Sequence, residues 1–329
     1  MHSTFTVIIT TYNRLELLKR AIQSCLAQTV PVEVVVVDDG SIDGTQDYLQ
    51  SLTSAVKVHC NTQNIGHLAS LDLAASLATT TWLKFLDDDD YLAPNCIEQM
   101  QQALELYPDA VICSCQSIQI DNDGYELSRT KYLTTEQIYY IPQADTHYLM
   151  LIEALPFGTP VQVACQRQAF LQQQQVFQRQ TKITTALNYH CDDIELWVRL
   201  ATQGDAVVLS KHLVYRTIWD GGFNAKISIQ DRLRTHVLIK QKMYELVSPK
   251  HKNRCPNLQD VQSFLHLHWG MIGIRHGQVL VGLSLILQAL RSPMSLSYYV
   301  NFLRYRKLKA TPEFDDPTSH KTETKPHSI

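Results

Sequence analysis

The strongest chemical signal in the chain is a run of four consecutive aspartates, residues 87–90, directly after the segment 82–86, which is apolar except for Lys84. Buried strands of a parallel sheet read as nearly continuous apolar runs, and ligands bind beyond the carboxyl ends of such strands. Adjacent carboxylates repel one another unless a hard divalent cation lies among them. The pattern therefore predicts a metal site, with a solvated acidic turn before the next helix as the alternative.

A second acidic pair, Asp38 and Asp39, follows the segment 32–37, which is apolar except for Glu33. The carboxyl ends of parallel strands meet at one edge of a sheet, so both acidic sites are expected at the same edge. An aspartate there can accept a hydrogen bond from a base N–H or a ribose hydroxyl. The two sites together suit a nucleotide diphosphate whose phosphates are neutralised by Mn²⁺ or Mg²⁺.

Residues 10–14 follow the strand predicted at 6–10, at the same edge, and include Tyr12, which offers a π-face for a base. Neither a GxGxxG nor a GxxxxGK sequence follows this strand. Glycine-rich loops of those kinds hold the phosphates in dinucleotide dehydrogenases and P-loop enzymes. Their absence from the sequence argues against both classes and leaves phosphate binding through a metal ion.

A third acidic pair, Asp192 and Asp193, stands where the helical pattern of residues 193–201 begins. Aspartate is favoured at a helix N-terminus, where it caps the first turn and is stabilised by the helix dipole. A carboxylate held near an incoming hydroxyl can also serve as a general base. The residues alone leave the two interpretations even.

The order of predicted elements indicates an α/β fold. Strand and helix patterns alternate up to about residue 106, which is typical of a doubly wound, mostly parallel sheet. We expect a strand at 111–120, an irregular stretch at 125–160 and only helices after residue 226. The predicted divisions are a catalytic domain at 1–225, a helical extension at 226–310 and a polar, disordered tail at 311–329.

Composition excludes several classes of protein. The chain has 329 residues, of which 45% are hydrophobic, and a net charge of −3, so nucleic acid binding has no electrostatic support. The eight cysteines show no CxxC spacing, and the N-terminus lacks the pattern of a secretory signal. We therefore expect reduced cysteines and a cytoplasmic location.

Membrane association, if it exists, is expected to be peripheral, because no apolar segment has the ~18–20 residues needed to span a bilayer. The longest, 279–290, is interrupted by polar residues and glycine. Between Arg291 and Lys309 there are five basic residues and no acidic ones. This region fits either an interfacial helix on the cytoplasmic face of an anionic membrane or a helical lid with a solvated basic face.

The motifs described above occur together in one known family of enzymes. The chain resembles the inverting, metal-dependent glycosyltransferases of family 2, which have the GT-A fold of nucleotide-diphospho-sugar transferases. The similar segments occur in the family's order and near its usual spacing, and cover residues 3–220: TVIITTYNR at 6–14, VVVVDDGSIDGT at 34–45, NIG at 64–66, LKFLDDDDYLAP at 83–94 and DDIELWVRL at 192–200.

The resemblance implies a role for each matching residue of the donor site. Thr11 and Tyr12 would contact the nucleotide, with Tyr12 against the base, and Arg14 is a candidate cationic contact to the donor. Asp38 and Asp39 match the acidic pair that binds the base and the ribose.

The remaining acidic residues match the metal and acceptor sites. Asp87 and Asp89 match the first and last positions of the metal-binding DXD motif, with Asp89 as the direct ligand, and Asp88 is assigned to donor binding. Asp90 would orient its neighbours or cap the next helix. Asp193 matches the acid that deprotonates the acceptor.

The implied function is a single displacement of the hexosyltransferase type in polysaccharide biosynthesis. Asp193 would remove the proton of an acceptor hydroxyl, on a glycan or lipid-linked acceptor, as its oxygen attacks the sugar of a UDP-sugar with inversion. A non-catalytic sugar-nucleotide or glycan-binding module and a sugar nucleotidyltransferase remain the alternatives.

The sequence departs from the family pattern at two positions. Leu71 stands where the family often has a donor-binding arginine, for which Lys84, Arg14 or Arg216 could substitute. Ile218 stands where a histidine often supplies a third protein ligand to the metal.

Overall fold

The computed structural model describes residues 4–52, 56–130, 137–155, 157–180, 192–218, 227–290 and 300. Its strands are β1 (Phe5–Thr11), β2 (Glu33–Asp38), β3 (Lys57–Cys60), β4 (Trp82–Asp87), β5 (Tyr91–Leu92), β6 (Ala110–Ile120), β7 (Glu126–Arg129), β8 (Ile138–Ile141), β9 (Val163–Gln166) and β10 (Asp205–Thr217). Its helices are α1 (Leu15–Leu26), α2 (Thr45–Ser51), α3 (His67–Leu77), α4 (Cys96–Leu106), α5 (Gln143–Leu151), α6 (Arg167–Gln180), α7 (Asp192–Leu200), α8 (Ile229–Leu246), α9 (Pro249–Lys252), α10 (Leu258–Arg275) and α11 (Val279–Ala289), with a 3₁₀ turn η1 (Pro160–Gln162).

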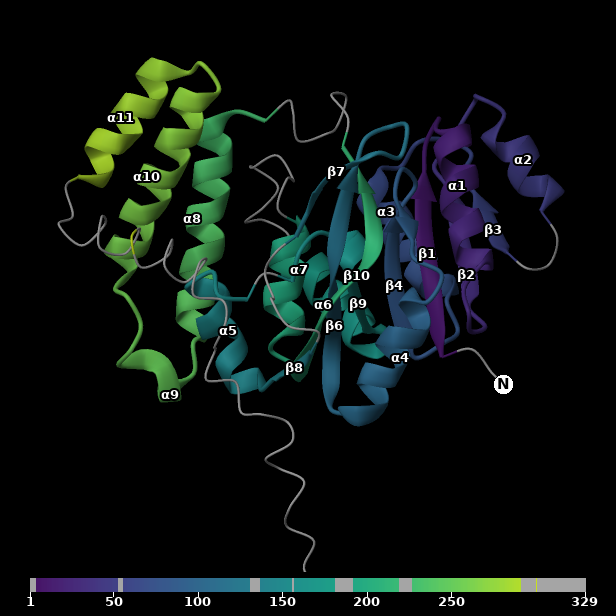
Figure 1. Ribbon diagram of the computed structural model, residues 1–329, viewed down its shortest axis with the longest axis horizontal. Coiled ribbons are helices and arrows are strands. Elements are labelled where there is room, and N and C mark those ends of the chain that lie inside the picture. Colours follow the sequence, from purple (N-terminus) through teal and green to yellow (C-terminus); the bar gives the residue numbers. More distant parts are fainter. Residues whose placement is uncertain are drawn as a thin grey trace, which may run out of the picture.

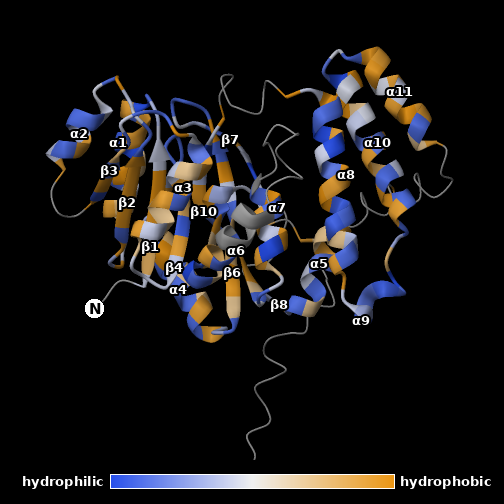
Figure 2. Ribbon diagram, turned by 180° about the vertical axis from the view of Figure 1, so that it is seen from behind, coloured by the Kyte–Doolittle hydropathy of each residue, from blue (hydrophilic) through white to orange (hydrophobic). Residues whose placement is uncertain are grey.

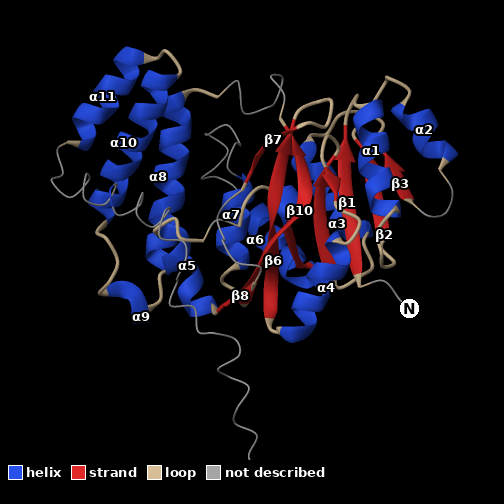
Figure 3. Cartoon of the chain, viewed as in Figure 1, coloured by secondary structure: helices blue, strands red, loops and turns tan. Residues whose placement is uncertain are grey.

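All strands belong to one sheet, which runs through the middle of the molecule (Figures 1 and 3). The strand order is β3-β2-β1-β4-β9-β6-β10-β5, with β7 beside β6 and β8 beside β10. The strands from β3 to β4 are parallel to one another, as are β6 and β10, whereas β9 is antiparallel to both of its neighbours. The predicted α/β fold with a doubly wound, mostly parallel sheet and a helical C-terminal part is therefore confirmed.

Two hydrophobic cores lie on the two faces of the sheet because successive side chains of a strand point to opposite faces. In β2, Val34 and Val36 belong to one core and Val35 and Val37 to the other. Helices α1, α2 and α4 cover the first face, and α3, α6 and α7 cover the second. Both faces are thus buried, which explains why the central strands read as continuous apolar runs.

The helices α8, α10 and α11 stand together at one end of the molecule (Figure 1). They have a small core of their own, but Ile239 and Met243 of α8 also join the sheet core that contains Trp197. The ammonium group of Lys240 donates to the carbonyls of Met150 and Leu151, at 2.8 and 2.9 Å. Helix α8 therefore packs on the part of the chain that contains the sheet, and the division after residue 225 stays a prediction. The tail at 311–329 lies outside the described residues.

The expectation of an irregular stretch at 125–160 is wrong, since this stretch contains β7, β8 and α5. Strands β7 and β8 are short edge strands; β7 forms a hairpin with β6, whereas β8 is held by β10, which is distant in sequence. Pro142 stands at the N-cap of α5 and does not break it. A proline near a helix start costs little, because the first N–H groups have no partner in the helix.

The cysteines of the described residues are all free, as expected; Cys191 lies outside them. Within the described ranges, no helix is both long and apolar enough to cross a bilayer.

Candidate functional site

A cavity of about 1120 Å³ opens at the carboxyl ends of β1 and β4. Helices α3 and α7 also contribute to its wall. The cavity brings together nearly all of the site residues predicted from the sequence: Thr11, Tyr12, Arg14, Asp39, Asp87, Asp88, Asp89 and Asp193. Asp38 is the exception, because it is not among the residues that line the cavity.

Three carboxylates from the aspartate run converge at the end of β4. One oxygen each of Asp87, Asp89 and Asp90 lies within 4.8 Å of the others. Oxygen atoms are the ligands that Mg²⁺ and Mn²⁺ prefer, so this set fits a divalent cation. Asp90 also accepts a hydrogen bond from the backbone N–H of Thr217, at 2.7 Å, which holds the turn against β10.

The electrostatics of the cluster point the same way. Burial, followed by the charges of Asp87 and Asp89, raises the pKa of Asp90 well above its ordinary value. Burial also raises the pKa of Asp87, which the charge of Asp89 raises further and those of His67 and Arg216 lower. Such a cluster is stabilised in its charged form by a cation bound among the carboxylates.

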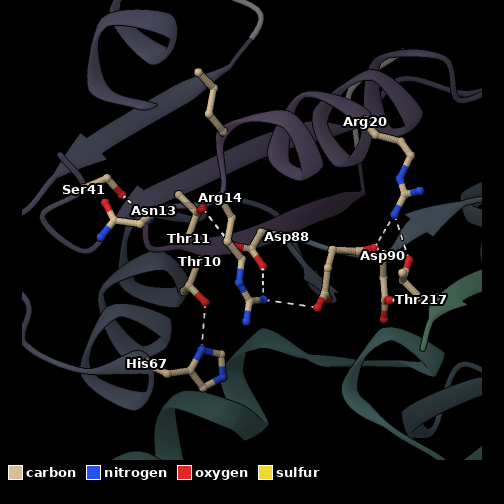
Figure 4. A network of polar contacts seen from close by, with 12 residues as sticks. Thr10, Thr11, Asn13, Arg14, Arg20, Ser41, His67, Asp88, Asp90 and Thr217 are labelled. Carbon is tan, nitrogen blue, oxygen red and sulfur yellow. Dashed lines mark hydrogen bonds and ion pairs between the residues drawn. The ribbon is translucent and has the colours of Figure 1, made fainter. Parts of the chain in front are cut away.

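Asp88 points away from this cluster, toward the loop after β1. Its carboxylate accepts hydrogen bonds from the Thr11 hydroxyl, at 2.8 Å, and from the Arg14 guanidinium, at 2.9 Å (Figure 4). Burial raises the pKa of Asp88 to about 6, although Arg14 and Thr11 oppose this shift. Arg14 also lies 3.2 Å from Asp89, so it fixes the aspartate run to the predicted nucleotide loop.

The loop after β1 owes its shape to Asn13, whose φ of 52° lies in the left-handed region. Asparagine tolerates this conformation better than most residues. The Asn13 N–H donates to the Ser41 hydroxyl and the Asn13 side-chain oxygen accepts from the Ile42 N–H, both at 2.8 Å (Figure 4 shows the Ser41 contact). The loops after β1 and β2 are thereby joined, and Tyr12 remains 46% exposed at the cavity wall.

The two aspartates after β2 have different surroundings. Asp39 accepts hydrogen bonds from the backbone N–H groups of Ile65 and Gly66, each at 2.9 Å, and from the Asn61 amide, at 3.0 Å. Burial raises the pKa of Asp39, but these bonds outweigh it and lower the pKa below its ordinary value. Asp39 therefore faces the cavity as a carboxylate, fixed at the start of α3.

Asp38, by contrast, is fully buried. Its oxygens accept from the Ser41 N–H, at 3.0 Å, and from the Gln46 amide, at 2.9 Å. These contacts close the turn between β2 and α2.

Asp193 lies in the first turn of α7 and faces the cavity. One of its oxygens accepts from the backbone N–H of Ile194, at 2.8 Å. Burial, with a further contribution from the charge of Asp87, raises the pKa of Asp193 to about 6. A carboxyl group with this pKa is ionised at neutral pH and can accept a proton. The side chain of Asp192 lies outside the described residues.

The rest of α7 has structural contacts. Trp197 is buried, packs edge-on against Phe85 at 5.7 Å and donates to the Gly158 carbonyl at 3.2 Å. Arg199 forms an ion pair with Glu195, which also binds Lys242 of α8 at 2.9 Å. These contacts fix the helix that carries Asp193.

Sequence analysis did not single out His67, Arg20 or Asp72. His67 lines the cavity and its Nδ1 lies 2.9 Å from the Thr10 hydroxyl (Figure 4). Arg20 of α1 donates to the Asp89 carbonyl, at 2.6 Å, and to the Thr217 hydroxyl, at 2.7 Å. The position of His67 directly after the Asn-x-Gly turn is a signal that could have been used, whereas the Arg20 contacts depend on tertiary packing.

Asp72 also lines the cavity, where burial raises its pKa to about 6.

The two departures from the family pattern both lie at the cavity, since Leu71 and Ile218 line it. Of the three proposed substitutes for the missing arginine, Arg14 and Arg216 line the cavity and Lys84 does not. Lys84 is fully buried, and its ammonium group donates to the carbonyls of Phe85 and Val161. It therefore ties β4 to η1 and is no candidate for contact with a donor.

Part of the chain is similar in sequence to known proteins. Over 112 residues, the chain is 36% identical to the glucosyl-dolichyl phosphate glucuronosyltransferase of Haloferax volcanii. This match covers 32% of this chain and 36% of that protein. Over 97 residues, it is 34% identical to the succinoglycan biosynthesis protein ExoO of Rhizobium meliloti. This match covers 29% of this chain and 28% of that protein. The matched region thus spans about a third of the length of these relatives.

Solved structures show the same fold. TarS 1–349 of S. aureus in complex with UDP-GlcNAc superimposes with a TM-score of 0.60 at 18% identity, over 95% of this chain and 83% of that one. The mannosyltransferase PcManGT of Pyrobaculum calidifontis, in complex with GDP-Man and Mn²⁺, gives a TM-score of 0.51 at 16% identity. This superposition covers 94% of this chain and 87% of that one. Residues 6–172, about half of the chain, match the model of the family described as glycosyl transferase family 2. The chain therefore belongs to glycosyl transferase family 2.

Proposed function

We propose that this glycosyltransferase is an inverting enzyme of the hexosyltransferase type. It moves a sugar from a nucleotide-diphosphate sugar, with a UDP-sugar as the favoured donor, to a hydroxyl of a glycan or lipid-linked acceptor in polysaccharide biosynthesis. The observation that supports it most is the shared cavity: Asp89, the predicted metal ligand, and Asp193, the predicted base, line the same space. Had they faced different clefts, no acceptor activated by Asp193 could reach a donor at Asp89.

The donor would bind along the ends of β1 and β2. Tyr12 offers its ring to the base, and Asp39 presents at the cavity a carboxylate that is fixed by Asn61, Ile65 and Gly66. A carboxylate oxygen there can accept a hydrogen bond from a base N–H or a ribose hydroxyl.

A divalent cation, Mn²⁺ or Mg²⁺, would be held by Asp87 and Asp89, with Asp90 beside them. When bound, it would neutralise the diphosphate and stabilise the charge that develops on the leaving group. Arg14 and Arg216 supply positive charge at the same wall of the cavity. These two residues would hold the donor phosphates in place of the arginine that Leu71 replaces.

Asp193 would accept the proton of the acceptor hydroxyl. The acceptor oxygen forms a bond to the anomeric carbon as the bond from that carbon to the diphosphate breaks, and the electron pair leaves with the nucleoside diphosphate. Attack from the face opposite the leaving group inverts the configuration. The hydrogen bond from the Ile194 N–H orients the carboxylate for this step.

A panel of nucleoside diphosphates tests the donor assignment. We expect UDP with Mn²⁺ to raise the melting temperature more than GDP, CDP or ADP with Mn²⁺, because a ligand that binds the native state stabilises it. UDP without metal should give a smaller shift. A larger shift with GDP would move the assignment to a GDP-sugar.

The stereochemistry needs a separate measurement. With a UDP-α-sugar and a suitable acceptor, the anomeric proton coupling of the first product should be that of a β-linkage. An α-linked product would contradict the inverting mechanism, and a metal-stabilised protein that transfers no sugar from any donor would favour the binding-module alternative.

A further inference from the structure

The outer face of α11 carries leucines that lie open to solvent. Leu280, Leu283, Leu287 and Leu290 are 84%, 47%, 67% and 60% exposed. They are three or four residues apart and therefore lie on one side of the helix. We name these four residues the leucine face. Isolated exposed leucines are ordinary on protein surfaces, but a contiguous apolar strip of this kind marks an interaction site.

The opposite side of α11 is fixed by close packing. Gly282, Leu285 and Ala289 are buried against the neighbouring helices. A Cβ atom on Gly282 would lie 2.6 Å from the carbonyl oxygen of Gly270 in α10, so the two helices touch backbone to backbone. Because Gly282 holds one side of α11 against α10, the exposed leucine face lies on another side of the helix. Helix α11 itself is at the outside of the helical group (Figure 2).

The charges around α11 indicate what the leucine face contacts. The helix itself contains no charged residue, Arg275 precedes it and Arg291 follows it. From Arg291 to Lys309 the sequence has five basic and no acidic residues, together with Tyr298, Tyr299, Phe302 and Tyr305. An apolar helix face next to basic and aromatic residues is the composition of segments that lie on anionic lipid.

We propose that the leucine face is a docking surface for an anionic lipid bilayer, with α11 lying in the plane of the interface. The geometry excludes crossing, because eleven residues of helix reach only about 16 Å, against a hydrocarbon thickness of about 30 Å. The four leucines would enter the boundary of headgroups and acyl chains, and the excess of basic residues in the sequence from Arg291 onward favours anionic headgroups. The negative surface potential of the cytoplasmic leaflet makes that leaflet the favoured one.

A second copy of the chain fits this surface less well. A helix about 16 Å long and 10 Å wide presents on the order of 200 Å², whereas a standard stable interface buries about 800 Å² on each partner. A twofold contact pairs identical patches, and the sequence from Arg291 to Lys309 contains no acidic residue that could pair with its five basic ones. Lipid headgroups supply the missing negative charge.

Vesicle flotation tests the proposal with the full chain. The vesicles are phosphatidylcholine alone, or phosphatidylcholine with an equal amount of phosphatidylglycerol. The variant Leu280→Glu/Leu287→Glu removes the most exposed part of the leucine face. The control Leu26→Glu/Leu106→Glu changes two leucines that are 50% and 56% exposed on the catalytic part. A third variant, Arg304→Gln/Arg306→Gln/Lys307→Gln/Lys309→Gln, removes basic charge.

We expect the unchanged chain and the control to float with the phosphatidylglycerol vesicles. The leucine-face variant should lose at least about tenfold in partition coefficient, because two apolar side chains no longer enter the interface. The charge variant should lose the preference for phosphatidylglycerol, as should the unchanged chain at high salt.

Four outcomes would overturn the proposal. The first is failure of the unchanged chain to float, and the second is flotation of the leucine-face variant as well as the control. The third is a dimer, seen by light scattering, that only the leucine-face variant dissociates, which would make a second copy the occupant. If the leucine-face variant instead lowers the melting temperature without lipid while the control does not, the chain covers this face itself. Circular dichroism verifies that each variant is folded.

Discussion

Asp87 at the end of β4 and Asp193 at the start of α7 are close enough for the charge of one to raise the pKa of the other. The two residues come from elements that are far apart in the sequence, yet they line one cavity. This relationship joins the predicted metal site to the predicted base. Burial, to which the charge of Asp87 adds, raises the pKa of Asp193 to about 6, so the base is ionised under neutral conditions but is less stable in that form than an ordinary aspartate.

Replacement of Asp193 by asparagine should remove transfer but keep nucleotide binding. The amide preserves the shape of the side chain but cannot accept the acceptor proton, and general-base catalysis is worth about 10²–10⁴ in rate. We expect kcat to fall by at least about a hundredfold, with the UDP-dependent melting shift nearly unchanged. Asp72→Asn is the matched control, because Asp72 is another cavity carboxyl with a pKa near 6 and has no assigned step. Equal losses of transfer and nucleotide binding in the Asp193 variant would make Asp193 structural.

The pKa of Asp193 predicts the pH dependence of transfer. Since the proton acceptor must be ionised, kcat should rise with pH through about 6 and level off above 7. Measurement of kcat from pH 5 to pH 8 at saturating donor and acceptor tests this. A profile that is flat down to pH 5 would contradict the assignment of Asp193 as the base.

The same pKa carries a stability prediction of definite sign. Because the folded pKa exceeds the ordinary value of 3.8, ionisation of Asp193 costs stability, and that cost grows as the pH rises from about 4 to 6. Asp193→Asn should therefore be more stable than the unchanged protein at pH 7, by roughly 1–3 kcal/mol. The difference should vanish near pH 4. Urea unfolding at both pH values measures it, and a variant that is less stable at pH 7 would show that the carboxylate is well compensated.

Asp89→Asn should separate metal-dependent from metal-independent nucleotide binding. Loss of one carboxylate from the cluster at the end of β4 removes a hard oxygen ligand and a negative charge. We expect Mn²⁺ to add little to the UDP-dependent melting shift of this variant, while the shift with UDP alone persists. The control Asp123→Asn changes an exposed acid in the turn between β6 and β7 and should behave as the unchanged protein. A full response to Mn²⁺ in the Asp89 variant would move the metal site elsewhere.

The sequence predicted the positions of the acidic strand ends because apolar runs mark buried parallel strands, and such strands end at one edge. It could not separate Asp38 from Asp39. The two are adjacent and identical in type, and only the turn after β2 decides which carboxylate faces the cavity. It also missed Arg20, whose contacts with the Asp89 carbonyl and Thr217 join three elements that are distant in sequence.

Sequence reasoning failed in a different way for the edge strands of the sheet and for helix α11. The short strand β8 is defined by its pairing with β10, which is distant in sequence, so local propensity gave no reliable signal for it. Strand β7 forms a hairpin with β6 and could have been predicted from the turn between them. The apolar pattern of α11 likewise predicted a helix but not which of its leucines stay exposed. That depends on the close approach of α10 at Gly282.

The different surroundings of Asp38 and Asp39 predict different effects on substitution. Asp39→Asn should weaken UDP binding, because Asp39 faces the cavity as a carboxylate that can accept a hydrogen bond from the ligand. Asp38→Asn should leave UDP binding nearly unchanged and lower stability by about 1–3 kcal/mol, because Asp38 is buried and accepts from Ser41 and Gln46. Calorimetry with UDP and urea unfolding of both variants provide the comparison. If Asp38→Asn weakens UDP binding as strongly as Asp39→Asn, both aspartates belong to the nucleotide site.

The contact between α10 and α11 predicts that Gly282→Ala destabilises the helical part. The added Cβ would lie 2.6 Å from the Gly270 carbonyl oxygen and 2.9 Å from the Ile274 nitrogen, both of which are backbone atoms that cannot move aside alone. Overpacking of this kind costs about 1–3 kcal/mol, which should exceed the gain in helix propensity from alanine. Ser284→Ala, at an exposed position of the same helix, should change stability by less than about 0.5 kcal/mol. Urea unfolding followed by circular dichroism measures both.

UDP binding should be unchanged in both variants, because the cavity is lined by other elements. A Gly282→Ala variant as stable as the unchanged protein would mean that α11 can shift on α10, and that the leucine face is not held in one orientation.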